Sequence, residues 1–138
     1  MWIVYAIGSS FFAGITAILA KCGIRRTDSD VATAIRTIVV LLFSWLMVLS
    51  TGTIWGIVNI DGKTVLFLVL SGLATGASWM CYYKALQEGP ASVVVPIDKL
   101  SILVTIAFSR IVFHEKLTKK AVAGLLCMTV GTLLFAVM

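Results

Sequence analysis

Long apolar runs separated by short polar connections set the pattern of the chain. Each run approaches the roughly 20 helical residues needed to cross a bilayer core about 30 Å thick. Glycine, proline and charged residues gather in the connections, where they are typical of turns between helices. The pattern predicts an all-α integral membrane bundle of five transmembrane helices, at residues 2–20, 32–50, 64–86, 92–113 and 121–138.

Composition changes this picture by excluding a soluble protein. Of the 138 residues, 60% are apolar and 12% are charged, whereas a soluble domain has about 45–50% apolar and about 25% charged residues. The 11 Lys and Arg residues are divided among the connections and do not form one basic surface. They are typical of membrane-edge anchors, so we expect the lipid bilayer as surroundings and no nucleic-acid partner.

The chain lacks the patterns typical of enzymes, metal sites and cofactor sites. It has no nucleophile with a neighbouring base, no paired carboxylates and no glycine-rich phosphate loop. Its three cysteines lack metal-ligand spacing, and His114 lies in a connection without a second histidine. We therefore expect no catalytic residue, no metal and no cofactor.

The basic residues give almost no preference for either orientation in the membrane. An odd number of spans places the two termini on opposite sides, and short basic connections normally select the cytoplasmic side. Two explanations stay open: dual insertion, which an antiparallel homodimer requires, or an orientation fixed by the first helix or a partner protein. The basic residues divide evenly, with Lys21, Arg25, Arg26, Arg36 and Lys84 on one side and Lys63, Arg110, Lys116, Lys119 and Lys120 on the other.

Polar residues recur at helical spacing within several runs. Such a stripe marks the face that turns toward other helices or water, because lipid offers hydroxyls no partner. In the alternative interpretation, each hydroxyl satisfies a carbonyl of its own helix and eases packing. The stripes are Ser9 and Thr16 in the first run, Thr33, Thr37 and Ser44 in the second, Ser71, Thr75, Ser78 and Tyr82 in the third, and Asp98, Ser101, Thr105 and Ser109 in the fourth.

Asp98 and Lys99 are the most demanding residues of the fourth run. Together they cost about 5 to 7 kcal/mol near the centre of a membrane helix, so they must be paired or hydrated. On a regular helix neighbours point about 100° apart, so we expect that they do not neutralise each other. Candidate partners are Arg36 or the same pair in an antiparallel second copy. Pro96 can kink the helix beside them, which predicts a hinge.

These residues predict a site that binds substrate or a proton. We assign to it Asp98, Lys99, Arg36, Ser101, Thr75, Ser78 and Tyr82. The alternatives are that Asp98 and Lys99 form purely architectural ion pairs with other helices, and that Arg36 only extends toward the first connection. Near the end of the third run, Trp79, Tyr82 and Tyr83 either stack a flat or cationic substrate or form an interfacial aromatic belt.

The last run carries a small-residue flank. Gly124 and Gly131 are seven residues apart, so they lie on nearly the same side of a helix and allow close approach of another one. We predict a dimer seam there.

The segment KALQEGPASVVVPI at residues 84–97, followed by HEKLT at 114–118 and then Gly124 and Gly131, resembles the EamA-like domain of the drug/metabolite transporter superfamily. Most members of the family that this segment resembles consist of two such domains in tandem, arranged as inverted repeats. The resemblance implies that two chains of this kind form the same antiparallel pair. The plan is also similar to small multidrug resistance transporters, but their membrane-embedded glutamate has no counterpart in the first run, which puts polyaromatic cation export in doubt.

The sequence therefore predicts a multi-pass transporter of a bacterial-type inner membrane. It would move a small metabolite or amphiphilic compound by alternating access, as a homodimer or paired with a similar half-length protein. The alternative is a non-transporting membrane subunit that scaffolds a larger complex. An ion channel is less favoured because no ring of like charges is present.

Overall fold

The computed structural model describes residues 1–137, and this range contains five helical segments long and apolar enough to cross a membrane. The predicted fold class is confirmed: the described part of the chain is helical and contains no strand. The fourth segment is divided into two helices. The helices are α1 (Trp2–Gly23), α2 (Ser29–Ser50), α3 (Gly62–Glu88), α4 (Ala91–Asp98), α5 (Ser101–Val112) and α6 (Lys119–Val137).

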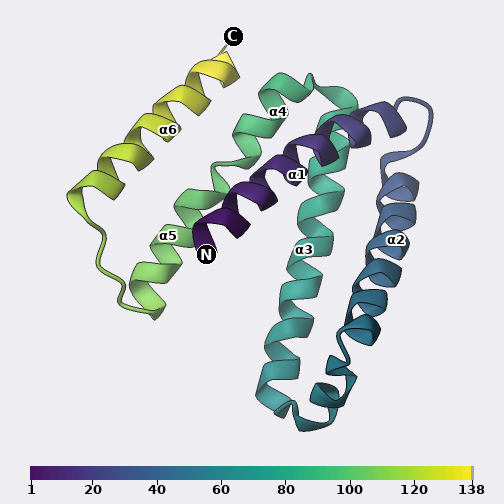
Figure 1. The fold of residues 1–138 in the computed structure, drawn as a ribbon. Coiled ribbons are helices and arrows are strands. Elements are labelled where there is room, and N and C mark those ends of the chain that lie inside the picture. The colour runs from purple at the N-terminus through teal and green to yellow at the C-terminus, as the bar shows by residue number, and fades with distance from the viewer. Residues whose placement is uncertain (138) are drawn as a thin grey trace. The chain divides into compact units, whose positions relative to one another are not determined.

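The observed helices extend one to three residues beyond most of the predicted ends. The chain continues in helical geometry past the apolar run wherever polar residues can still form backbone hydrogen bonds in the interface. The predicted last helix included Met138, which lies outside the described residues. The chain forms two compact units, Met1–Gln87 and Glu88–Met138, and Figure 1 identifies their helices.

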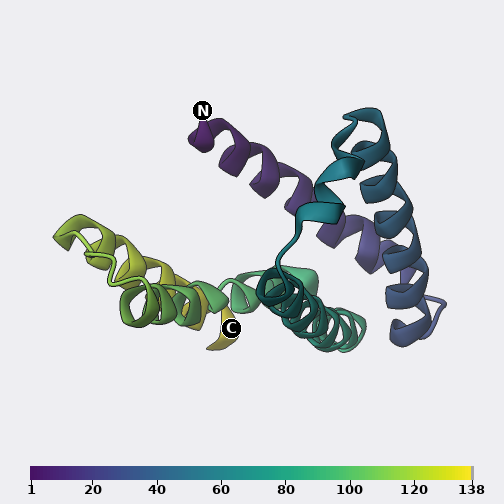
Figure 2. The same cartoon turned by 90° about the horizontal axis from the view of Figure 1, so that it is seen from below.

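The first unit contains α1, α2, α3 and a short 3₁₀ helix, η1 (Thr53–Asn59), within the connection predicted to be a loop. The Asp28 carboxylate caps α2 by accepting the Asp30 backbone N–H at 3.0 Å. Gly52 follows α2 with φ of 67°, a left-handed conformation that glycine adopts without strain. Figure 2 shows the chain passing from α2 through η1 into α3.

The buried core of the first unit lies where the α1–α2 connection meets the end of α3. Ile24, Tyr83 and Leu86 are at most 2% exposed there. The Lys21 ammonium donates a hydrogen bond to the Leu86 carbonyl, and Gln87 Nε2 donates to the carbonyls of Ile24 at 3.5 Å and Thr27 at 3.1 Å. These bonds satisfy two carbonyls of the connection between α1 and α2 and one carbonyl of α3, so they hold the three helices together at this end.

The second unit contains α4, α5 and α6, and α6 packs against α4 (Figure 1). Leu125, Thr129 and Thr132 are the most enclosed side chains around the middle of α6. Their spacing of four and three residues places them on one face of the helix. Thr118 precedes α6, and its hydroxyl accepts the Ala121 backbone N–H at 3.3 Å.

Large apolar side chains on most helices remain exposed. Phe12 is 68% exposed, Phe67 70%, Phe108 63% and Leu126 62%. Soluble monomers rarely expose contiguous apolar surfaces of this extent. Lipid tails cover such faces without cost, so the exposure follows from a multi-pass membrane protein.

Candidate functional site

A groove between α2 and α3 brings together two of the predicted polar stripes. It has a volume of ≈ 420 Å³, within the range of roughly 300–1,000 Å³ that small-molecule pockets occupy. Val40 stands at the middle of α2 and Thr75 at the middle of α3. Because both helices are membrane spans, the groove lies near the middle of the bilayer. Its lining residues are Thr37, Val40, Leu41, Ser44, Leu68, Ser71, Gly72, Thr75, Gly76 and Trp79.

Three of the four groove hydroxyls are oriented by their own helices. Thr37 donates to the Thr33 carbonyl at 2.7 Å, Ser44 to the Val40 carbonyl at 2.8 Å and Thr75 to the Ser71 carbonyl at 2.8 Å. Each hydroxyl has one proton and two acceptor lone pairs, so its oxygen can still accept a hydrogen bond. The groove therefore offers acceptor oxygens between apolar walls, which suits an amphiphile that carries N–H or O–H groups.

The alternative interpretation, that each hydroxyl donates to a carbonyl of its own helix, is thus correct for the protons of these three hydroxyls. It does not remove the groove, because Thr37 and Ser44 on α2 face the same hollow as Ser71 and Thr75 on α3. Both statements hold at once: the proton is used within the helix and the oxygen remains available.

A second hollow adjoins this groove at the η1 end of the first unit. It has a volume of ≈ 290 Å³ and apolar walls from Trp45, Val48, Ile57 and Ile60. Ser44 lines both hollows, so they are neighbours along α2. An apolar tail of a molecule held in the groove would find matching surface there.

Arg36 is held by aromatic side chains of α3. Its Nη1 donates a hydrogen bond to the Tyr83 hydroxyl at 2.6 Å, and its guanidinium carbon lies 4.4 Å from the centre of the Trp79 ring and 5.4 Å from that of Tyr83. Trp79 and Tyr83 are four residues apart, so both rings occupy one face of α3. Cation–π attraction and a charge-assisted hydrogen bond together compensate a half-buried positive charge without a carboxylate.

Trp79, Tyr82 and Tyr83, which the sequence analysis interpreted together, have different surroundings in the structure. Tyr83 is 2% exposed, so it belongs to the core of the first unit and not to an interfacial belt. Trp79 lines the groove while the Arg36 guanidinium lies over its ring. Tyr82 is half-buried, with its ring 6.1 Å from that of Tyr83.

The fourth membrane span is interrupted at Lys99 and Leu100, directly after α4 ends at Asp98 and three residues after Pro96. Proline has no N–H, so the Ser92 carbonyl lacks its usual partner four residues later. The Lys99 N–H donates to the Pro96 carbonyl at 3.1 Å, and the Leu100 N–H to the Ile97 carbonyl at 2.9 Å. These bonds join residues three apart, a 3₁₀ pattern that often marks a hinge inside a helix. Regular helix resumes at Ser101.

The interruption corrects one expectation about the charged pair. We expected Asp98 and Lys99 not to neutralise each other, but Lys99 Nζ lies 3.7 Å from Asp98 Oδ2. The expectation was wrong because it assumed a regular α-helix across both residues, whereas Asp98 ends α4 and Lys99 lies in the 3₁₀ turn that follows. The separation is too long for a hydrogen bond, so the carboxylate oxygens of Asp98 keep their capacity to accept one.

The other predicted site residues divide between the two units. Ser78 is exposed on α3 and does not line the groove. Ser101 begins α5, and its carbonyl accepts the Thr105 hydroxyl at 3.1 Å. Gly124 and Gly131 lie on a flank of α6 about 110° around the helix from the face toward α4. A methyl group added at either glycine would meet nothing within 4 Å.

Sequence reasoning missed that Tyr83 is the buried partner of Arg36. Thr37, Ser44 and Ser71 belonged to the predicted stripes but not to the selected site residues. A usable signal existed in each case: Trp79 and Tyr83 share a helical spacing, and Thr37 and Ser44 are seven residues apart on α2. Only the pairing of α2 with α3 was needed to combine them.

Comparison with known proteins identifies relatives along the whole described chain. The model of the EamA-like transporter family matches residues 1–137. The chain is 44% identical over 136 residues to an uncharacterized transporter in the cobO 3′ region of Sinorhizobium sp, covering 99% of this chain and 96% of that protein. It is 27% identical over 105 residues to the uncharacterized protein MJ1333.1 of Methanocaldococcus jannaschii, covering 70% of this chain and 77% of that protein. No solved structure matches it.

The family match and the similarity to a protein named as a transporter agree with the five membrane spans. They also agree with the resemblance drawn from the motif that begins at Lys84. The chain belongs to the EamA-like transporter family.

Proposed function

We propose that the chain moves a small metabolite or amphiphilic compound across a bacterial-type inner membrane by alternating access. Family membership supports transport in general terms. The observation that carries the substrate path is the α2–α3 groove, with its hydroxyl oxygens at the middle of two membrane spans. Hydroxyl oxygens at this depth have a clear use in transport, because lipid offers them no hydrogen bond and a substrate crossing the bilayer needs such partners.

The interrupted fourth span supports the same proposal. Discontinuous helices in transporters leave backbone and side-chain groups free to bind substrate or a coupling ion, and they give the span a point to bend. In this scheme Asp98 binds substrate or a proton, Lys99 is its counter-charge and Pro96 is the hinge. Arg36 supports the groove by holding Trp79 in place.

The working unit in this proposal is an antiparallel dimer. A balanced distribution of Lys and Arg between the two sides favours insertion in both orientations. The open glycine flank of α6, with Gly124 and Gly131, gives a second helix room to approach. The Sinorhizobium relative is matched over 96% of its length, so five spans also account for nearly all of that protein. The partner is a second copy or a similar half-length chain.

Cysteine accessibility tests the groove. In a variant without Cys22, Cys81 and Cys127, single cysteines replace Thr75 and Ser44, and a membrane-impermeant maleimide is applied to membrane vesicles. We expect both positions to react, because a transport path is reached by water from at least one side. Phe67→Cys, on the same helix but outside the groove, is the matched control and should stay unlabelled in lipid.

The same experiment separates transport from scaffolding. A subunit that only scaffolds a complex would bury the hydroxyl stripe against a partner. Failure of Thr75→Cys and Ser44→Cys to react from either side of the membrane would contradict the groove as a path. The proposal requires that water reaches the groove and that the protein transports a compound. Labelling of both cysteines, together with uptake of one compound from a metabolite panel into proteoliposomes, would meet these two requirements.

Topology tests the antiparallel pair independently. Reporter fusions to the C-terminal end of α6 should give signal on both sides of the membrane. A strictly one-sided signal would exclude an antiparallel homodimer and require a partner of opposite orientation.

A further inference from the structure

The connection between α5 and α6 forms a basic hollow that the transport proposal does not use. Arg110, His114, Glu115, Lys116 and Leu117 line it, and its volume is ≈ 420 Å³. It belongs entirely to the second unit. We propose that it binds the phosphate group of an anionic phospholipid, independently of which substrate the protein carries.

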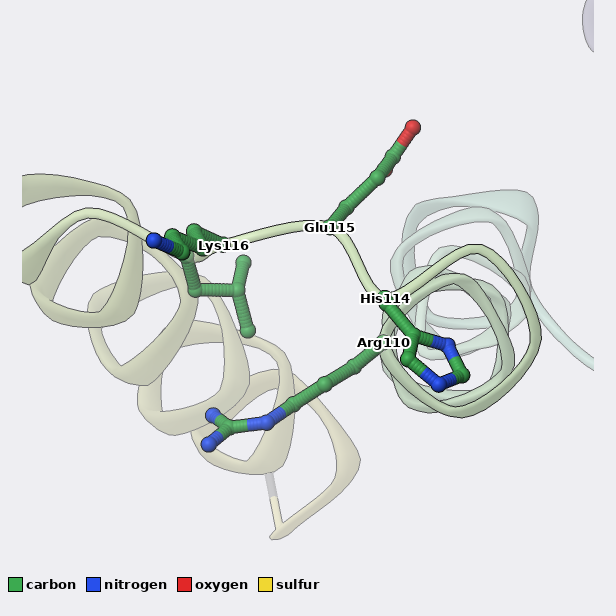
Figure 3. Close-up of a pocket in the computed structure, with 5 residues that line it drawn as sticks. Arg110, His114, Glu115 and Lys116 are labelled. Atoms are coloured by element: carbon green, nitrogen blue, oxygen red, sulfur yellow. The ribbon is translucent and has the colours of Figure 1, made fainter.

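The positive charges of residues 110–120 are not balanced by negative charges within the same segment. Between residues 110 and 120 the chain has four Lys or Arg side chains and one carboxylate. That carboxylate, on Glu115, accepts a hydrogen bond from the Ser109 hydroxyl. Figure 3 shows the Glu115 side chain pointing away from Arg110 and Lys116, which extend toward the same side of the connection. The two cations therefore face the hollow without an anionic partner among the described residues.

The start of α6 increases the positive potential. Unpaired backbone N–H groups give a helix N-terminus a partial positive charge, so acidic residues normally occupy the first turn. In α6 the first turn contains no acidic residue and begins with Lys119 and Lys120. Repulsion between these groups is relieved when an external anion binds nearby.

The backbone turns at His114 to bring the basic residues together. His114 has φ of 55° and is the only non-glycine residue with positive φ in the described chain. Left-handed geometry commonly ends a helix by reversing the chain, although glycine is the usual residue there. The reversal after α5 returns Lys116 to the side of Arg110 (Figure 3).

Position and surroundings select a lipid as the source of the phosphate. Residues 113–118 connect the fourth and fifth membrane spans, so they lie at the membrane boundary where phospholipid headgroups are located. Beside the hollow, Phe113 is 74% exposed and Ile111 is 71% exposed. These side chains offer apolar surface for acyl chains next to cations for the phosphate. A free phosphate ion would use only the second of these features.

Native mass spectrometry of the purified full-length protein tests this proposal with three probes: dioctanoyl phosphatidylglycerol, dioctanoyl phosphatidylcholine and inorganic phosphate. We expect the wild-type protein to bind phosphatidylglycerol on the order of tenfold more tightly than phosphatidylcholine, because both lipids carry the phosphate but the basic hollow repels the choline ammonium. The Arg110→Gln, Lys116→Gln double variant should lose this preference. The Lys119→Gln, Lys120→Gln double variant removes the same charge outside the hollow and should keep most of it.

A variant of opposite sign excludes misfolding as an explanation. Glu115→Gln removes the only negative charge from the lining, so it should tighten binding of phosphatidylglycerol, which a damaged fold would not do. Equal loss of preference in both double variants would show a diffuse surface charge and overturn the site. Displacement of phosphatidylglycerol by millimolar inorganic phosphate would show an ion site and overturn the lipid as its occupant.

Discussion

The two units compensate membrane-depth charge in different ways. In the first unit Arg36 is satisfied by α3, through the Tyr83 hydroxyl at 2.6 Å and the Trp79 ring at 4.4 Å. In the second unit Asp98 and Lys99 are adjacent in sequence and pair at 3.7 Å where the helix is interrupted. The compensation of the Arg36 charge depends on contact between two helices, whereas the pairing of Asp98 with Lys99 depends on local backbone geometry.

This difference indicates which residues serve stability and which serve function. A charge held by long-range contacts helps to define the fold, so removing its partner should lower the free energy of unfolding. A charge pair made locally contributes little to packing between helices. Retaining two charges in an apolar span without a packing role favours a binding function for them.

The largest expected effect is on transport by Asp98→Asn. The substitution keeps shape but removes the negative charge, so uptake into proteoliposomes of the compound found by the metabolite panel should fall about 10- to 100-fold. Thermal unfolding in detergent should change little, because among the described residues Asp98 forms an ion pair only with its sequence neighbour. Full, still pH-dependent uptake by this variant would remove Asp98 from the mechanism.

An exchange of charges distinguishes binding from architecture. Asp98→Lys combined with Lys99→Asp keeps an ion pair but moves the carboxylate by one position. If Asp98 binds substrate or a proton, this double variant should remain as inactive as Asp98→Asn. Recovery of uptake would show that only the pair is needed, and would assign it to structure.

A smaller effect is expected from Pro96→Ala. Alanine restores the N–H that proline lacks and favours a continuous helix from α4 into α5. Uptake should fall about tenfold because the span loses its bending point, while the melting temperature in detergent stays the same or rises. Pro90→Ala is the matched control, since Pro90 precedes α4 at its N-cap and does not interrupt a helix. Unchanged uptake by Pro96→Ala would exclude a hinge there.

The sequence was most informative where structure depends on local pattern. Apolar runs located all five spans because hydropathy and length alone decide whether a helix crosses lipid. The same local rule failed at Asp98 and Lys99, because it assumed a regular helix across Pro96. Arg36 and Tyr83 are 47 residues apart. No periodicity within one helix encodes such a contact, so the partner of Arg36 required the packing of α2 with α3.

The smallest expected effect, on stability alone, comes from Tyr83→Phe. The phenyl ring keeps its packing and its cation–π contact, but Arg36 Nη1 loses the acceptor at 2.6 Å. Hydrogen bonds to charged groups contribute about 1.5 to 3 kcal/mol, and partial hydration of Arg36 places the expected loss near the lower value. Chemical unfolding of the protein in micelles measures it.

Tyr5→Phe is the control for this substitution, because Tyr5 is 77% exposed on α1. It should leave the free energy of unfolding within experimental scatter. Uptake by Tyr83→Phe should remain within a few-fold of the wild type, because its hydroxyl supports Arg36 and does not line the groove. If this variant instead abolished uptake at unchanged stability, the Arg36 cluster would belong to the transport path, and the division between a structural charge in the first unit and a functional one in the second would be wrong.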